Sequence, residues 1–70
     1  MDMATRFAIK AVVAGLHESK AISDEAVRAI GVALQGAADG IGGPDWNRTD
    51  DAASIRRLAD EIVADAGLRL

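Results

Sequence analysis

A chain of 70 residues with a formal charge of −3 and no cysteine has room for one domain, and the lack of cysteine excludes disulfide bonds and thiolate metal sites. Only 20 residues are large and apolar (Val, Ile, Leu, Met, Phe or Trp) and 15 are alanine, so the expected core is thin. Without disulfide bonds or thiolate metal sites, self-association is the remaining way to stabilise such a small core. No apolar run could span a membrane and no signal peptide is recognisable, so we expect a cytoplasmic protein without membrane contact.

The first expected element is an alanine-rich helix over residues 3–19 that is apolar on two sides. One side carries four branched residues: Ile9, Val12, Val13 and Leu16. The opposite side is our candidate surface for self-association: Met3, Phe7, Ala11 and Ala14. A basic stripe runs between them: Arg6, Lys10 and His17. A chain this short cannot bury both sides, so the second side indicates an interface; alternatively, Phe7 folds over the end of the bundle and the alanines are solvent-exposed helix formers.

The second expected helix, over residues 24–39, has the clearest ends. Ser23 is its N-cap, Ile22 and Val27 form a hydrophobic staple, and Gly40 is its C-terminal stop. Its apolar residues recur at helical spacing: Val27, Ile30, Leu34, Ala37 and Ile41. The connection from the first helix is short, which favours antiparallel neighbours.

Residues 40–49 are the expected loop, with three glycines and the single proline. Trp46 is the sole tryptophan, and a tryptophan in a polar loop is typical of a binding hot spot. The candidate partner-binding residues of this loop are Asp45, Trp46, Asn47 and Arg48. The alternative is that Trp46 lies back over the open end of the bundle and closes the core.

The third expected helix covers residues 50–66, with Thr49 as its cap and Gly67 as its stop. Together the three helices predict an all-α fold, a small antiparallel three-helix bundle forming a single domain. Its expected core consists of nine large side chains: Ile9, Val12, Leu16, Val27, Ile30, Leu34, Ile55, Leu58 and Ile62.

The sequence offers no convincing catalytic, cofactor or metal site. His17 is the only histidine, and no cysteine is present to act as a nucleophile. Asp45, Asn47 and Thr49 match the first, third and fifth positions of an EF-hand-like loop, but Arg56 stands where the closing glutamate is required. We therefore expect a protein that is not an enzyme.

The remaining class is a protein–protein interaction module, an adaptor, regulator or inhibitor that occupies a partner's surface as a homodimer. Its candidate contacts are the Trp46 loop and the basic stripe. The competing class is a dimeric nucleic-acid-binding regulator that uses the basic stripe. Residues 1–20 carry a charge of +1 and residues 21–70 a charge of −4, so phosphate binding is disfavoured and nucleic acid is the less expected partner.

Overall fold

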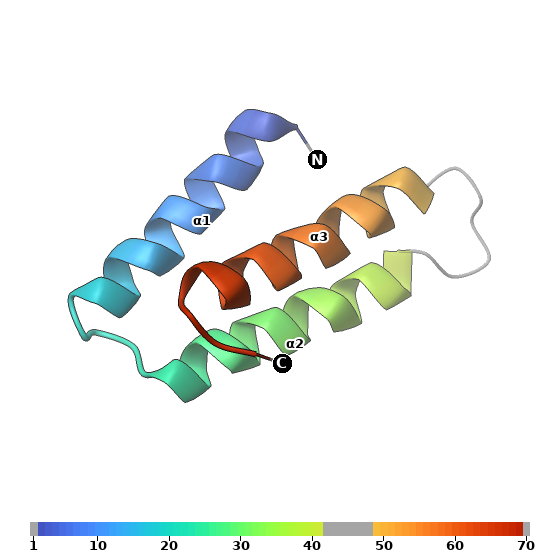
Figure 1. Cartoon of the computed structure of the whole chain (residues 1–70). Helices are drawn as coiled ribbons and strands as arrows, with labels where there is room; N and C mark the ends of the chain where they lie inside the picture. The colour runs from blue at the N-terminus through green and yellow to red at the C-terminus, as the bar shows by residue number, and fades with distance from the viewer. Residues whose placement is uncertain (1, 42–48, 70) are drawn as a thin grey trace.

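The computed structural model describes residues 2–41 and 49–69, with the backbone alone at 41 and 49. Within these ranges it contains three α-helices and no strand: α1 (Met3–Glu18), α2 (Asp24–Ile41) and α3 (Thr49–Asp65) (Figure 1). The predicted all-α, three-helix fold is confirmed. The stop predicted at Gly40 is wrong, because α2 continues to Ile41. Gly40 lies in the last turn, where a glycine weakens the helix without ending it.

The helix ends follow from local hydrogen bonds. The Ser23 hydroxyl accepts from the Ala26 N–H at 3.1 Å, which confirms the predicted N-cap of α2. Asp2 caps α1 in the same way, since its Oδ1 accepts from the Thr5 N–H at 2.7 Å. The sequence reading missed that cap. After α3, Gly67 adopts a φ of 77° and so provides the predicted stop.

The turn between α1 and α2 is a Schellman motif without glycine. The Lys20 N–H donates to the His17 carbonyl at 3.1 Å, and the Ala21 N–H donates to the Leu16 carbonyl at 2.9 Å. Lys20 occupies the left-handed position with a φ of 65°. A side chain with a Cβ is strained in that conformation, so this turn stores strain that the C-terminal turn of α3 avoids with Gly67.

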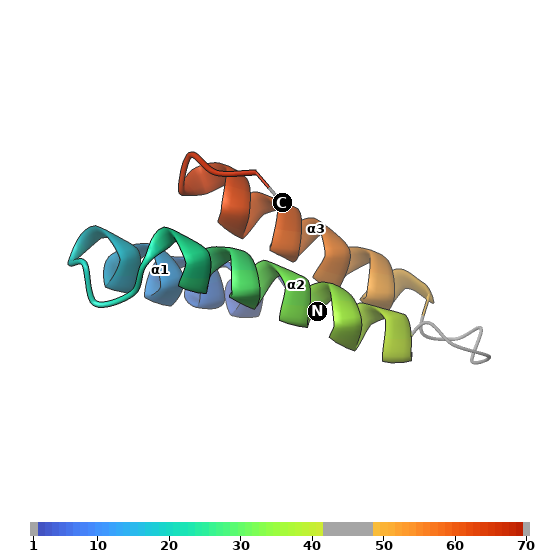
Figure 2. The same ribbon diagram turned by 90° about the horizontal axis from the view of Figure 1, so that it is seen from below.

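The core lies chiefly between α2 and α3, which lie side by side (Figures 1 and 2). Val27 and Leu58 are its largest fully buried side chains. Four of the six other buried residues of this pair are alanine or glycine: Gly31, Ala38, Ala52, Ala59, Ile62 and Val63. Alanines at a helix interface let the two backbones approach closely, but each adds little apolar area. The core is therefore as thin as the composition indicates.

Helix α1 joins this core by a narrow contact. It packs more on α3 than on α2, and Figure 2 shows α3 lying above both. Val13 is its buried residue, and Ile9 packs partly against the same cluster. Val12 and Leu16 are 62% and 42% exposed, so their predicted place in the core is wrong. When a helix is apolar on two sides, its sequence does not determine which residues face inward. In this structure the side of α1 that carries Val13 faces α3.

The remaining predicted core residues fall into two groups. Val27, Leu58 and Ile62 are buried, as expected. Four others are only half-buried: Ile9, Ile30, Leu34 and Ile55. Ile9, Ile30 and Leu34 pack at the edge of the cluster, where α1 makes only a narrow contact with the α2–α3 pair. The radius of gyration, 12.3 Å, is accordingly somewhat larger than the value of about 11 Å typical of a folded chain of this length.

Candidate interaction surface on the first helix

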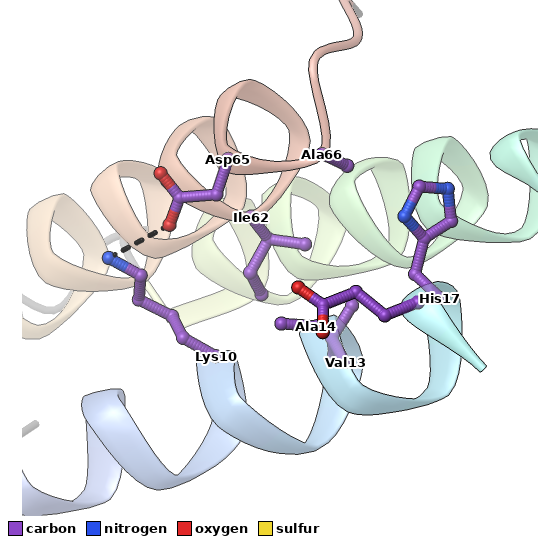
Figure 3. Close-up of a pocket in the computed structure, with 8 residues that line it drawn as sticks. Lys10, Val13, Ala14, His17, Ile62, Asp65 and Ala66 are labelled. Carbon is purple, nitrogen blue, oxygen red and sulfur yellow. Dashed lines mark ion pairs between the residues drawn. The ribbon is translucent and has the colours of Figure 1, made fainter.

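The cationic side chain of Lys10 points toward α3. Its Nζ lies 3.2 Å from Glu61 Oε2 and 3.2 Å from Asp65 Oδ2, and Figure 3 shows the pair with Asp65. Hydrogen bonds to Asp65 and then to Glu61 raise the pKa of Lys10 above its usual value of 10.5. The Lys10 charge is therefore compensated within the chain, where it helps to dock α1 on α3.

His17 makes the corresponding contact to α2. Its Nε2 lies 2.8 Å from Asp24 Oδ1, and the His17 side chain is only 22% exposed. The hydrogen bond from His17 lowers the pKa of Asp24 below its usual value of 3.8. Asp24 stands in the first turn of α2, where the helix dipole also favours a carboxylate. His17 thus fastens the end of α1 to the start of α2.

Arg6 is the third residue of the basic stripe. Its Nε is buried and has no hydrogen-bond partner in the described part of the chain. The Arg6 guanidinium carbon lies 6.0 Å from the centroid of the Phe7 ring, and Lys10 Nζ lies 5.7 Å from it, at the limit of a cation–π contact. Lys10 and His17 therefore lie on the side of α1 that meets the other helices, and Arg6 is half-buried. Their predicted role in binding a partner stays a prediction.

The side of α1 that faces away from the core is apolar, the reverse of an ordinary surface helix. Met3 is 63% exposed, Phe7 53%, Val12 62% and Leu16 42%. Ten residues of α1 between positions 3 and 16 are exposed, and none of them is charged: Met3, Ala4, Thr5, Phe7, Ala8, Ala11, Val12, Ala14, Gly15 and Leu16. We call these ten residues the outward face of α1. A contiguous apolar surface of this kind is typical of an interaction site.

The outward face of α1 has two parts, which lie on either side of the basic stripe. The Phe7 side carries the four residues predicted for self-association, all of which are exposed: Met3, Phe7, Ala11 and Ala14. The Val12 side carries the two residues wrongly expected in the core, together with a small neighbour: Ala8, Val12 and Leu16. A shallow depression of about 260 Å³ on the Val12 side is lined entirely by apolar residues: Ala8, Ile9, Val12 and Val13.

A second groove of about 260 Å³ runs between α1 and α3 (Figure 3). Its lining combines an apolar floor with charged or titratable rim residues: Lys10, Val13, Ala14, His17, Glu18, Ile62, Asp65 and Ala66. On this rim Lys10 and Asp65 already form an ion pair, and His17 is hydrogen-bonded to Asp24. Over the described ranges, no group of three or more His, Asp or Glu residues could hold a metal ion. The groove therefore offers mixed apolar and polar contact.

The predicted loop site lies outside the described residues. It comprises Asp45, Trp46, Asn47 and Arg48. Sequence reasoning recognised the Phe7 side but missed the Val12 side, because it assigned Val12 and Leu16 to the core. One sequence signal could have corrected the assignment of Val12 and Leu16 to the core. Two acidic residues, Glu61 and Asp65, lie at the edge of the apolar face of α3, and they attract Lys10 toward α3.

Comparison with known proteins gives no relative from which a function could be transferred. No protein-family model matches the chain, and neither the curated proteins nor the solved structures contain a significant match. Among the described residues, no helix is long and apolar enough to cross a membrane. The outward face of α1 is therefore the feature of this chain that bears on its function.

Proposed function

We propose that this protein is a small, non-enzymatic protein–protein interaction module, an adaptor, regulator or inhibitor, whose α1 helix is the contact surface. In this proposal the three helices form an antiparallel unit, the unit is a homodimer, and α2 and α3 serve as the support for α1. The observation that carries the proposal is the uncharged outward face of α1, with Lys10 and His17 directed toward the other helices.

The chemistry of the Val12 side indicates the kind of partner. Burying one large apolar side chain contributes roughly 1.5–3 kcal/mol, and Val12 and Leu16 are both available for such burial. The depression beside Val12 is apolar, so it suits an aliphatic or aromatic side chain. The partner is therefore expected to offer an apolar helix or groove with no charge at its centre.

The geometry weakens the nucleic-acid alternative at two of the three residues of the basic stripe. A protein that binds phosphates needs free cations, whereas Lys10 is paired with Glu61 and Asp65, and His17 is hydrogen-bonded to Asp24. Arg6 Nε has no hydrogen-bond partner in the described part of the chain, so Arg6 is the stripe residue that still fits this alternative. Trp46 and its neighbours stay a predicted second contact, which a Trp46→Ala variant tests alongside α1.

The test is affinity capture from cells of the native host, before and after nuclease treatment. Val12→Glu places a charge on the Val12 side, and Val32→Glu is the matched control on α2. Val32 is 59% exposed and Val12 is 62% exposed, so both substitutions meet solvent in the free protein. Circular dichroism establishes that both variants keep the helix content of the wild type.

We expect wild type and Val32→Glu to retain the same protein after nuclease treatment, and Val12→Glu to lose it at least tenfold. Direct binding of the identified partner to the purified variants then measures that loss. Equal capture by Val12→Glu and wild type would refute the role of α1. Recovery of nucleic acid alone would refute the functional class and restore the competing one.

A further inference from the structure

We infer that α1 is a hinged lid on the α2–α3 pair, which opens by rotation about Lys20 and Ala21 while the pair stays folded. The open form exposes apolar side chains that the closed form buries between α1 and α3, chiefly Val13 and Ile62. The hinge goes beyond the proposed function, because it is a property of the chain without a partner.

The α2–α3 pair has a core that does not depend on α1. Val27 and Leu58 are fully buried, and α2 and α3 contact each other far more extensively than either contacts α1. An ion pair also joins these two helices, with Arg56 Nη2 2.6 Å from Asp39 Oδ1. Helix α1, by contrast, contributes Val13 as its buried residue. A segment with few buried apolar contacts opens at a lower free energy than the rest of the fold, so α1 is expected to leave before the pair separates.

The contact between α1 and α3 is incompletely packed. The groove of about 260 Å³ lies between them, lined by Val13 and Ala14 from α1 and by Ile62 and Ala66 from α3 (Figure 3). Side chains that border a gap lose part of the contact that close packing provides. Lys10 spans the two helices with ion pairs that reach solvent, and such pairs add little and are screened by salt. The docking of α1 is therefore weak.

The turn after α1 supplies the hinge. Lys20 has a φ of 65°, which is strained for a residue with a Cβ, and the strain is released when the turn opens. The N–H groups of Ala21 and Ile22 donate back across Lys20 to the Leu16 carbonyl, at 2.9 and 3.4 Å. The Ile22 side chain, however, packs against the core. Rotation at Lys20 and Ala21 thus breaks these two hydrogen bonds and leaves the Ile22 side chain in place.

Opening enlarges the surface that the proposed partner would meet. The depression beside Val12 is also lined by Ile9 and Val13, which pack against the core in the closed form. Undocking exposes both side chains, so α3 competes with a partner for this side of α1. This consequence, unlike the hinge itself, rests on the proposed function.

Native-state amide hydrogen exchange of the full chain at pH 7 tests the hinge. An isolated helix of 16 residues is marginal in water, so α1 loses protection when it leaves α3. We expect the α1 amides beyond the first turn, with those of Ala21 and Ile22, to share one opening and to be protected about tenfold less than the Val27 and Leu58 amides. Protection that declines gradually toward the N-terminus would show fraying, and equal protection throughout would show a single cooperative unit. Either result overturns the inference.

Two matched substitutions test what holds the lid closed. Lys10→Gln removes the ion pairs to α3, and the control Arg56→Gln removes the ion pair between α2 and α3. We expect Lys10→Gln to lower the protection of all α1 amides by about threefold and to leave Leu58 unchanged, whereas Arg56→Gln should leave α1 unchanged. An equal loss at α1 and at Leu58 in Lys10→Gln would show that α1 opens only by global unfolding, which overturns the hinge. Capture that is sensitive to Val12→Glu would stand in that case, so the proposed function is tested separately.

Discussion

His17 Nε2 lies 2.8 Å from Asp24 Oδ1 and thereby ties the last turn of α1 to the first turn of α2. Lys10 makes the equivalent link from the middle of α1 to Glu61 and Asp65 of α3. Since Val13 is the buried residue of α1, these polar contacts add to a small apolar contact that holds the helix in place. The docking of α1 is consequently the part of the fold most sensitive to pH and salt.

We expect α1 to loosen at acid pH before α2 and α3 separate. The pKa of Asp24 is lowered in the folded state by the hydrogen bond from His17, so this contact stabilises the fold fully above pH 3.8. The stabilisation is lost as the pH falls through the lower, folded-state pKa. Amide hydrogen exchange of α1 measured between pH 6 and pH 2 would show this as protection lost earlier in α1 than around Leu58.

Asp24→Asn is the control for this effect, because it removes the titrating group but keeps a polar side chain in the first turn of α2. The variant should lose the part of the acid response that arises at residues 16–22. Asp2, whose pKa is lowered by hydrogen bonds from Thr5, titrates in the same direction at the other end of α1. An unchanged acid response of residues 16–22 in Asp24→Asn would show that the His17 contact does not hold the helix.

The free energy of unfolding should respond very differently at two positions that the sequence assigned to the same core. Leu58→Ala empties a fully buried site and should cost about 2–5 kcal/mol. Val12→Ala acts at a side chain that is 62% exposed and should change stability by less than about 0.5 kcal/mol. Denaturant melts at a concentration low enough for monomers measure both. A comparable loss of unfolding free energy at the two positions would show that Val12 belongs to the core.

The two left-handed turns should respond in opposite directions. Lys20→Gly is expected to stabilise the protein by up to about 1 kcal/mol, because the strain relieved, roughly 1–2 kcal/mol, exceeds the added unfolded-state entropy of glycine, about 0.4–1 kcal/mol. Gly67→Ala should destabilise it by a similar amount. An added Cβ at Gly67 meets nothing within 4 Å, so its φ of 77° is the only obstacle.

Thermal and denaturant unfolding of Lys20→Gly, Gly67→Ala and wild type measure these changes. A stabilising Gly67→Ala, or a Lys20→Gly that lowers the midpoint, would show that the Schellman turns are not where the strain resides. Gly36→Ala, in the open interior of α2, is the control for helix propensity alone.

The sequence by itself determined the helices and most of their ends. Ser23 caps α2 and Gly67 ends the turn after α3 because both effects depend on atoms within a few residues of the chain. The apolar periodicity of α2 and α3 correctly predicts Val27, Leu58 and Ile62 as core. On the same faces Ile30, Leu34 and Ile55 are only half-buried, and Ala37 is exposed. The helix stop expected at Gly40 does not form, because a glycine near a helix end permits a stop without requiring one.

Only the tertiary structure decided how α1 is rotated. Val12 and Val13 are adjacent in sequence and point about 100° apart, so two apolar sides leave the local pattern without a unique inward direction. The choice depends on Lys10 reaching Glu61, 51 residues away, and on His17 reaching Asp24 across the turn. Those contacts turn Lys10 and His17 inward and leave Phe7 and Val12 at the surface, because a helix with apolar residues on two sides can bury only one direction in a chain with a single thin core.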